Sequence, residues 1–160
     1  MAFERIAIIG LGLLGGSVGL AVQAHLPNAM TTGYDADPAT RSRAAERGLV
    51  DRVCECAADA VRDADLVILC VPVGAMGAAA REIAPHLADG VVISDVGSSK
   101  ESVARVLAEA LPGRAVIPAH PVAGTERSGP DAGFASLCQQ RWCIITPPDA
   151  ADPAQVAMLS

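Results

Sequence analysis

The chain has 160 residues, of which 51% are hydrophobic and 19% are charged, and its formal net charge is −6. Such a composition suits about one globular domain with enough apolar material for a core, and it excludes a disordered chain. The acidic balance supplies no basic field for a phosphate backbone, and the two Phe, one Tyr and one Trp offer few platforms for stacking bases. Nucleic acid is therefore not expected as a partner.

The five cysteines are odd in number and show no spacing typical of a disulfide framework, so reduced thiols are expected. Cys54 and Cys56 flank Glu55, but no histidine or second cysteine pair lies near them, so loop or edge-strand thiols are favoured and no metal site is predicted. Residues 6–22 are apolar, yet Glu4 precedes them and glycines interrupt them, unlike a signal peptide. No apolar run reaches the ~18 residues of a membrane span. We expect a soluble cytoplasmic protein without a membrane partner.

Strand-like apolar runs alternate with helical stretches along the chain. In chain order, the expected elements are a strand at 5–9, a helix at 15–25, a strand at 30–34, a helix at 38–47, a short piece at 50–54, a short helix at 57–62, a strand at 66–71, a helix at 73–86, a strand at 91–94, a helix at 100–111, a strand at 115–119, a loop over 121–140, a strand at 142–146 and a helix from residue 153. Alternation at this spacing indicates an α/β fold: a Rossmann-type, doubly wound, mainly parallel sheet with right-handed crossovers.

Local signals support several of these boundaries. Pro27 follows the first helix, Pro38 suits the first turn of the second helix, and Gly48 suits its end. We expect a dinucleotide-binding domain over residues 1–150. Residues 151–160 are expected to begin a helix that leads into an absent further domain, and its apolar face should then lack a partner and fray.

The glycine-rich segment at 10–15 is the first functional signal. It follows an apolar strand, opens a helix, and has Asp35 at the end of the next strand. Gly10 permits the tight turn, Gly12 lets the backbone approach a pyrophosphate, and Gly15 lets the helix pack closely on the strand. Together these features predict a dinucleotide cofactor.

Asp35 decides which dinucleotide is expected. Its carboxylate would accept hydrogen bonds from the ribose hydroxyls and repel a 2′-phosphate, which favours NAD over NADP. An alternative is that Asp35 serves as a turn residue, because residues 35–38 also suit a helix start. Arg41 and Arg43 lie nearby in the sequence and would soften the discrimination.

His120 is the second functional signal, since it ends an apolar strand and precedes a polar loop that contains glycine. Residues 95–100 follow the preceding strand, at the sheet edge where α/β folds bind ligands. A hydroxyl of Ser98 or Ser99 there would orient the imidazole, cap the next helix, or do both. An imidazole that handles protons beside a hydride-carrying cofactor predicts a dehydrogenase.

These stretches resemble the prephenate and arogenate dehydrogenases, which perform the oxidative step of tyrosine biosynthesis. The resemblance runs from the glycine loop through Val71-Pro72 and residues 95–100 to residues 120–129, and the last two stretches are the most specific. It implies NAD-dependent oxidation of prephenate or arogenate, with loss of the ring carboxylate as carbon dioxide. The cofactor-binding residues that it implies are Gly10, Gly12, Leu13, Leu14, Gly15, Asp35, Val71, Pro72 and Ser98.

The resemblance also implies the catalytic residues. His120 would accept a hydrogen bond from the ring hydroxyl of the substrate, and Ser98 would bond to both His120 and that hydroxyl. Glu126 would gate the site, with Thr125 beside it. Family members continue into a helical domain that completes the substrate pocket and forms a homodimer, so residues 1–160 alone are expected to be inactive.

Two other functions remain open. A dehydrogenase of the β-hydroxyacid type shares the glycine loop but commonly relies on a lysine in its helical domain, and the segment at 120–126 argues against it. A regulatory nucleotide-binding module without catalysis is the second. Reduction of the cofactor in the presence of prephenate or arogenate separates these functions.

Overall fold

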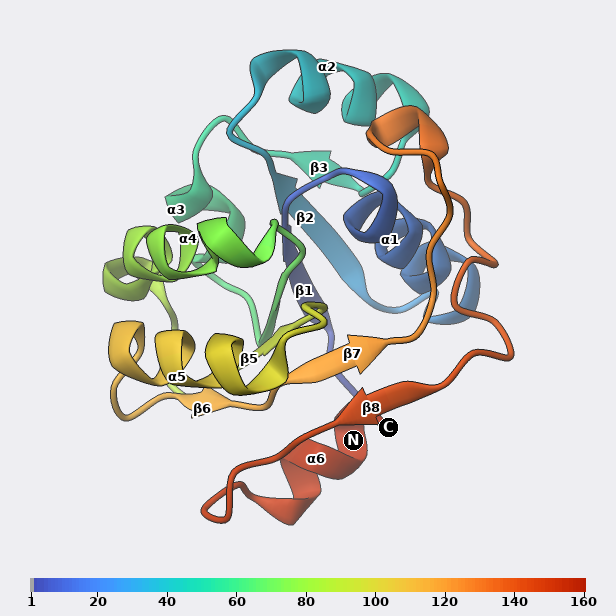
Figure 1. Cartoon of the computed structure of the whole chain (residues 1–160). Coiled ribbons are helices and arrows are strands. Elements are labelled where there is room, and N and C mark those ends of the chain that lie inside the picture. The colour runs from blue at the N-terminus through green and yellow to red at the C-terminus, as the bar shows by residue number, and fades with distance from the viewer. Residues whose placement is uncertain (1) are drawn as a thin grey trace.

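Six parallel strands form the centre of the molecule, in the order β3-β2-β1-β4-β5-β6 (Figure 1). The computed structural model describes residues 2–160. The strands are β1 (Arg5–Ile9), β2 (Met30–Tyr34), β3 (Arg52–Val53), β4 (Leu66–Leu69), β5 (Val92–Asp95) and β6 (Ala115–Val116). This order confirms the predicted doubly wound sheet, and it reverses between β1 and β4. A crevice at the carboxyl edge of these two strands is where such sheets bind ligands.

Helices cover both faces of the sheet (Figure 1). They are α1 (Leu13–His25), α2 (Pro38–Arg47), α3 (Ala57–Val61), α4 (Met76–Ile83) and α5 (Lys100–Ala110). Alternate residues of β1 enter different cores, since Ile6 and Ile8 pack with α1 and α2, whereas Ala7 and Ile9 pack with α3, α4 and α5. This alternation is the period of two that a strand imposes.

Local capping explains why α2 begins and ends where predicted. Pro38 occupies the first turn, and the Asp37 side chain accepts a hydrogen bond from the N–H of Ala39 at 3.2 Å. Gly48 ends the helix with a φ of 62°. The helix predicted at 73–86 is instead α4 flanked by two short 3₁₀ turns, Val73–Ala75 and Ala84–His86. Helix α1 begins two residues before the predicted start, at Leu13.

The prediction of one strand over 115–119 is wrong. Strand β6 ends at Val116, and Pro118 follows, which has no N–H for a sheet ladder. The chain then forms β7 (Ala119–Pro121), which pairs antiparallel with β8 (Cys143–Ile145) in a separate two-stranded sheet. His120 therefore lies inside β7, opposite Ile144, and not at the end of a strand of the main sheet. The strand predicted at 142–146 belongs to this second sheet.

Helix α6 (Pro153–Leu159) ends the chain beside β8 (Figure 1). Val156, Met158 and Leu159 pack against the core on the α1 side of the sheet, together with Ile145. The expectation that its apolar face lacks a partner is therefore wrong. Within residues 2–160, no helix is both long and apolar enough to cross a membrane.

Candidate functional site

A pocket of about 680 Å³ lies at the carboxyl edge of β1, β2 and β4. This volume is within the range of small-molecule sites. The cofactor-binding candidates in its wall are Gly10, Gly12, Leu13, Leu14, Asp35, Val71 and Pro72. Gly15 and Ser98 are not in the wall. Most of the candidates taken from widely separated parts of the sequence thus meet in one place.

The glycine loop has a geometry that only glycine permits at two positions. Gly10 has a φ of 97°, and a Cβ there would lie 2.7 Å from the carbonyl oxygen of Cys70. A Cβ on Gly15 would lie 1.8 Å from the carbonyl oxygen of Gly10. Gly12 differs, because nothing lies within 4 Å of its Cβ position. The loop therefore packs tightly against the protein behind it and leaves open space at Gly12, where a phosphate group has room to approach the backbone.

Asp35 supports this loop directly. Its Oδ2 accepts a hydrogen bond from the N–H of Leu11 at 2.9 Å, and its Oδ1 accepts one from the N–H of Asp37 at 2.9 Å. Each carboxylate oxygen can accept more than one hydrogen bond, so capacity for ribose hydroxyls remains. Asp35 is thus both the turn residue and a carboxylate in the pocket wall.

The two arginines near Asp35 in the sequence both contact protein groups other than its carboxylate. The Nη1 of Arg41 donates to the Asp35 carbonyl oxygen at 2.8 Å, its guanidinium lies 5.5 Å from the centre of the Tyr34 ring, and its Nη2 lies 3.4 Å from Glu55. Arg43 contacts Glu46 and Asp131. Neither arrangement presents a guanidinium to the carboxylate of Asp35.

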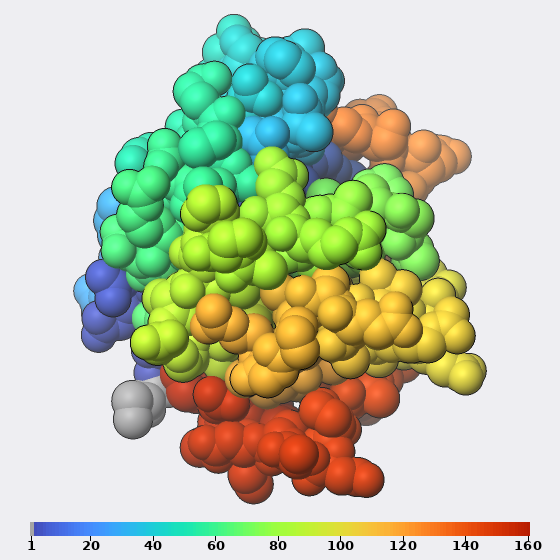
Figure 2. Space-filling view, turned by 90° about the vertical axis from the view of Figure 1, so that its left-hand side faces the viewer, coloured from blue at the N-terminus to red at the C-terminus, as the bar shows by residue number. Residues whose placement is uncertain are grey.

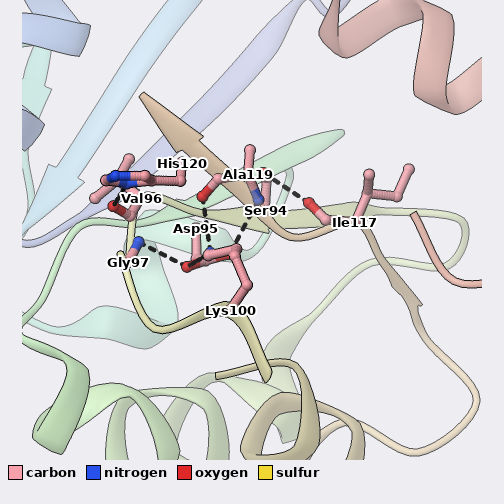
Figure 3. Close-up of polar contacts among 8 residues, drawn as sticks. All are labelled: Ser94, Asp95, Val96, Gly97, Lys100, Ile117, Ala119 and His120. Atoms are coloured by element: carbon pink, nitrogen blue, oxygen red, sulfur yellow. Dashed lines mark hydrogen bonds and ion pairs between the residues drawn. The ribbon is translucent and has the colours of Figure 1, made fainter. Parts of the chain in front are cut away.

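An ion pair between the buried Asp95 and the partly buried Lys100 holds the strand that carries His120. Asp95 ends β5 and is 1% exposed, and the ammonium group of Lys100 contacts its Oδ2. Lys100 also donates to the carbonyl oxygen of Ala119 at 2.8 Å, and the N–H of Ala119 donates to Oδ1 of Asp95 at 3.2 Å. Figure 3 shows these contacts beside His120. Both backbone polar groups of Ala119 are therefore fixed by one ion pair.

The imidazole of His120 has a defined contact. Its Nδ1 lies 3.3 Å from the carbonyl oxygen of Val96 (Figure 3). Because a carbonyl oxygen only accepts hydrogen bonds, this contact favours the tautomer in which Nδ1 carries the proton. The lone pair of Nε2 is then available to accept a proton. Val96 also lines the pocket, so His120 adjoins its wall.

The other catalytic candidates do not join His120. Ser98 is exposed, and within residues 2–160 no hydrogen bond connects it to His120. Ser99 occupies the N-cap position of α5, but its side chain makes no capping hydrogen bond. The Thr125 hydroxyl accepts a hydrogen bond from the N–H of Arg127 at 3.2 Å, and Glu126 is exposed. Neither Thr125 nor Glu126 lines the pocket.

All five cysteines are free thiols. Cys70 lines the pocket, and burial raises the pKa of its thiol far above the ordinary value. Burial likewise raises the pKa values of Cys138 and Cys143. These groups therefore stay protonated at neutral pH and are poor nucleophiles.

Sequence reasoning missed one part of the wall. Arg127, Ser128 and Gly129 line the pocket from the long loop after β7, which is far from the glycine loop in the sequence. A long loop rich in glycine and proline was the available signal, since such loops in compact domains are usually functional. Glu82 of α4 also lies in the wall.

Comparison with known proteins gives consistent results. Residues 18–160 match the family model described as prephenate dehydrogenase, nucleotide-binding domain. Over 153 residues the chain is 50% identical to a cyclohexadienyl dehydrogenase of Zymomonas mobilis, covering 96% of this chain and 52% of that protein. It is 30% identical over 158 residues to a prephenate dehydrogenase of Bacillus subtilis, covering 98% of this chain and 43% of that protein.

Among solved structures, the fold is similar to that of a prephenate dehydrogenase from A. aeolicus in complex with hydroxyphenyl propionate and NAD+. The TM-score is 0.90 and the identity is 26%, over 99% of this chain and 56% of that chain. The chain spans about half the length of the curated relatives that it matches.

Proposed function

The chain belongs to the prephenate dehydrogenase family, and from this premise we propose that it is the nucleotide-binding part of an NAD-dependent enzyme that oxidises and decarboxylates prephenate or arogenate. The observation that carries the proposal is the pocket itself. The glycine loop and Asp35 form one of its ends, and Val96, whose carbonyl oxygen contacts His120, forms another part of its wall.

The pocket fits a dinucleotide. The open space at Gly12 accommodates a pyrophosphate, and the first N–H groups of α1 have no partners within the helix, so they are available to an anion. Asp35, which lines the pocket, would bind the ribose hydroxyls, and Leu13, Leu14, Val71 and Pro72 would contact the cofactor. When bound, NAD accepts a hydride from the substrate. A NAD-linked relative of known structure supports this choice of cofactor.

His120 acts as the hydrogen-bond acceptor for the substrate hydroxyl. Nδ1 donates to the carbonyl oxygen of Val96, so Nε2 is free to receive the proton of the substrate hydroxyl. It receives this proton as the ring carbon that bears the hydroxyl gains ketone character. Asp95 and Lys100 hold the backbone immediately before His120, which keeps the imidazole beside the pocket. Loss of the ring carboxylate as carbon dioxide makes the ring aromatic and drives the reaction.

The relatives are about twice as long as this chain, which supports a further segment in the working enzyme. We place in that segment the remaining walls of the substrate site and the contacts of a homodimer. Ser98, Thr125 and Glu126 then complete the catalytic site once substrate and these walls are present. A cytoplasmic location fits a biosynthetic enzyme whose cysteines are unpaired.

The test is NADH formation by the longer protein, followed by absorbance, with prephenate and arogenate supplied separately. We expect turnover with at least one of them. The 160-residue chain assayed in parallel should bind NAD but form little NADH, because positioning of the substrate is lost. Binding of NAD without turnover in the longer protein would instead favour a regulatory nucleotide-binding module.

A further inference from the structure

Arg127 is the only residue with a cationic side chain among the described residues that form the pocket wall. The other charged residues there, Asp35 and Glu82, are anionic. A dinucleotide brings two further negative charges in its pyrophosphate. Without Arg127, every charged side chain around that ligand would repel it. We propose that Arg127 binds the pyrophosphate of the cofactor, an inference that rests on the proposed function and extends it.

The side chain of Arg127 is available for this role. Its residue is exposed, and within residues 2–160 its guanidinium makes no hydrogen bond or ion pair. Arg47, Arg41 and Arg43, in contrast, all contact protein groups. The five N–H donors of this guanidinium are therefore all available to hydrogen-bond a ligand in the pocket.

Arg127 begins a segment, residues 127–134, that we call the strap. Helix α2 holds the C-terminal part of the strap. The Nε of Arg43 contacts Asp131 at 2.5 Å, and the Nη1 of Arg47 donates to the carbonyl oxygens of Pro130 and Gly133, the latter at 3.1 Å. Arg43 and Arg47 are four residues apart, so they extend from one face of α2. Figures 1 and 2 both show the strap in orange beside α2 in cyan.

The strap also presses against the start of α1. The N–H of Phe134 donates to the buried hydroxyl of Ser17 at 3.0 Å. A Cβ on Gly133 would lie 3.2 Å from the Ser17 nitrogen and 3.3 Å from the Gly16 carbonyl carbon, so the two backbones are nearly in contact. This approach anchors the strap next to the helix start that follows the glycine loop. Arg127 and the glycine loop that precedes this helix both line the pocket.

This arrangement matches the chemistry of a pyrophosphate. Guanidinium groups bind phosphate oxygens through paired, charge-assisted hydrogen bonds, which are stronger than neutral ones. Backbone N–H groups of the glycine loop would bind one side of the phosphates, and Arg127 would close the other.

The test compares ligands that differ in phosphate, in the unmodified chain and in Arg127→Gln. ADP and NAD carry the two phosphates, and adenosine carries none. We expect Arg127→Gln to weaken ADP and NAD binding roughly tenfold in calorimetric titration, the scale of a hydrogen bond to a charged group. Adenosine binding should change less than about twofold, and the gap between variants should shrink as salt is raised.

Arg105→Gln is the matched control, because Arg105 is an exposed arginine outside the pocket wall and its loss changes the net charge equally. It should bind ADP as the unmodified chain does. Arg127→Lys should recover part of the affinity. Thermal melting should be the same for all variants, since Arg127 has no partner to lose.

Equal ADP affinity in Arg127→Gln and the unmodified chain would overturn the inference and leave NAD binding intact. Failure of the unmodified chain to bind ADP or NAD would overturn both the inference and the proposed function.

Discussion

Lys100 donates a hydrogen bond to the carbonyl oxygen of Ala119, with 2.8 Å between the two atoms. Because Ala119 precedes His120, this bond connects the first turn of α5 to the residue that positions the imidazole. The carboxylate of Asp95 completes the connection by accepting the N–H of Ala119. This ion pair thus helps to hold the second sheet against the first, because no continuous strand within residues 2–160 joins them.

Replacing Lys100 tests this attachment. Lys100→Met leaves Asp95 buried without a cation, and breaking such a pair typically costs about 3–5 kcal/mol. We expect a loss of this order in the free energy of unfolding, measured with urea. The double variant Asp95→Asn/Lys100→Met should recover part of the loss, because no buried charge remains. If Lys100→Met is as stable as the unmodified chain, the pair does not hold the strand.

Alanine substitutions at two glycines of the loop should have different effects, one on stability and the other on NAD affinity. Gly15→Ala forces a Cβ to within 1.8 Å of the Gly10 carbonyl oxygen, so we expect a loss of stability at or above the usual ~1–3 kcal/mol of overpacking. Gly12→Ala meets no protein atom within 4 Å and should change stability by less than ~1 kcal/mol. Its methyl group occupies the space assigned to the phosphates, so NAD affinity should fall roughly tenfold. Unaltered NAD binding by a folded Gly12→Ala would place the phosphates elsewhere.

Asp37 gives the expected pH dependence of one helix. Hydrogen bonds from the Thr40 hydroxyl and the Ala39 N–H lower the pKa of the Asp37 carboxyl. A pKa lowered by folding adds stability above the unfolded value of about 3.9, and this stability is lost as the pH falls through the folded value. Asp37→Ala should therefore lower the melting temperature at pH 7, and the difference from the unmodified chain should shrink below about pH 4. Ser42→Ala, at an exposed position of the same helix, removes no carboxyl group and serves as the control, so it should show no such trend.

His120→Asn in the longer protein tests the assigned proton acceptor. Loss of a positioned acid–base group usually costs about a hundredfold in turnover or more, and we expect that loss here. NAD affinity should barely change, because His120 is outside the pocket wall. Ser98→Ala should do less harm, since the imidazole remains. Turnover close to normal in His120→Asn would remove His120 from the mechanism.

Much of the main sheet could be predicted from the sequence because its signals are local. Apolar runs mark β1, β4 and β5, and Asp37, Pro38 and Gly48 mark the ends of α2. The glycine loop was also predictable, since its spacing is a consequence of one tight turn between a strand and a helix.

Long-range contacts explain what the sequence did not predict. The break between β6 and β7 depends on the pairing of β7 with β8. Pro118 was the one local signal against a continuous strand, because proline has no N–H for a sheet ladder. The strap is fixed by Arg43 and Asp131, which lie 88 positions apart, so no local pattern indicates that it reaches the pocket. The role of Asp95 was hidden for the same reason, because its partner Ala119 belongs to another element.

Calorimetric titration of NAD and NADP into the 160-residue chain tests the central claim most directly. The account predicts saturable binding of one NAD per chain, with NADP bound more weakly because the Asp35 carboxylate repels the 2′-phosphate. Asp35→Ser should narrow that preference, although it also removes the acceptor for the N–H of Leu11. No binding of NAD, or tighter binding of NADP than of NAD by the unmodified chain, would contradict the account.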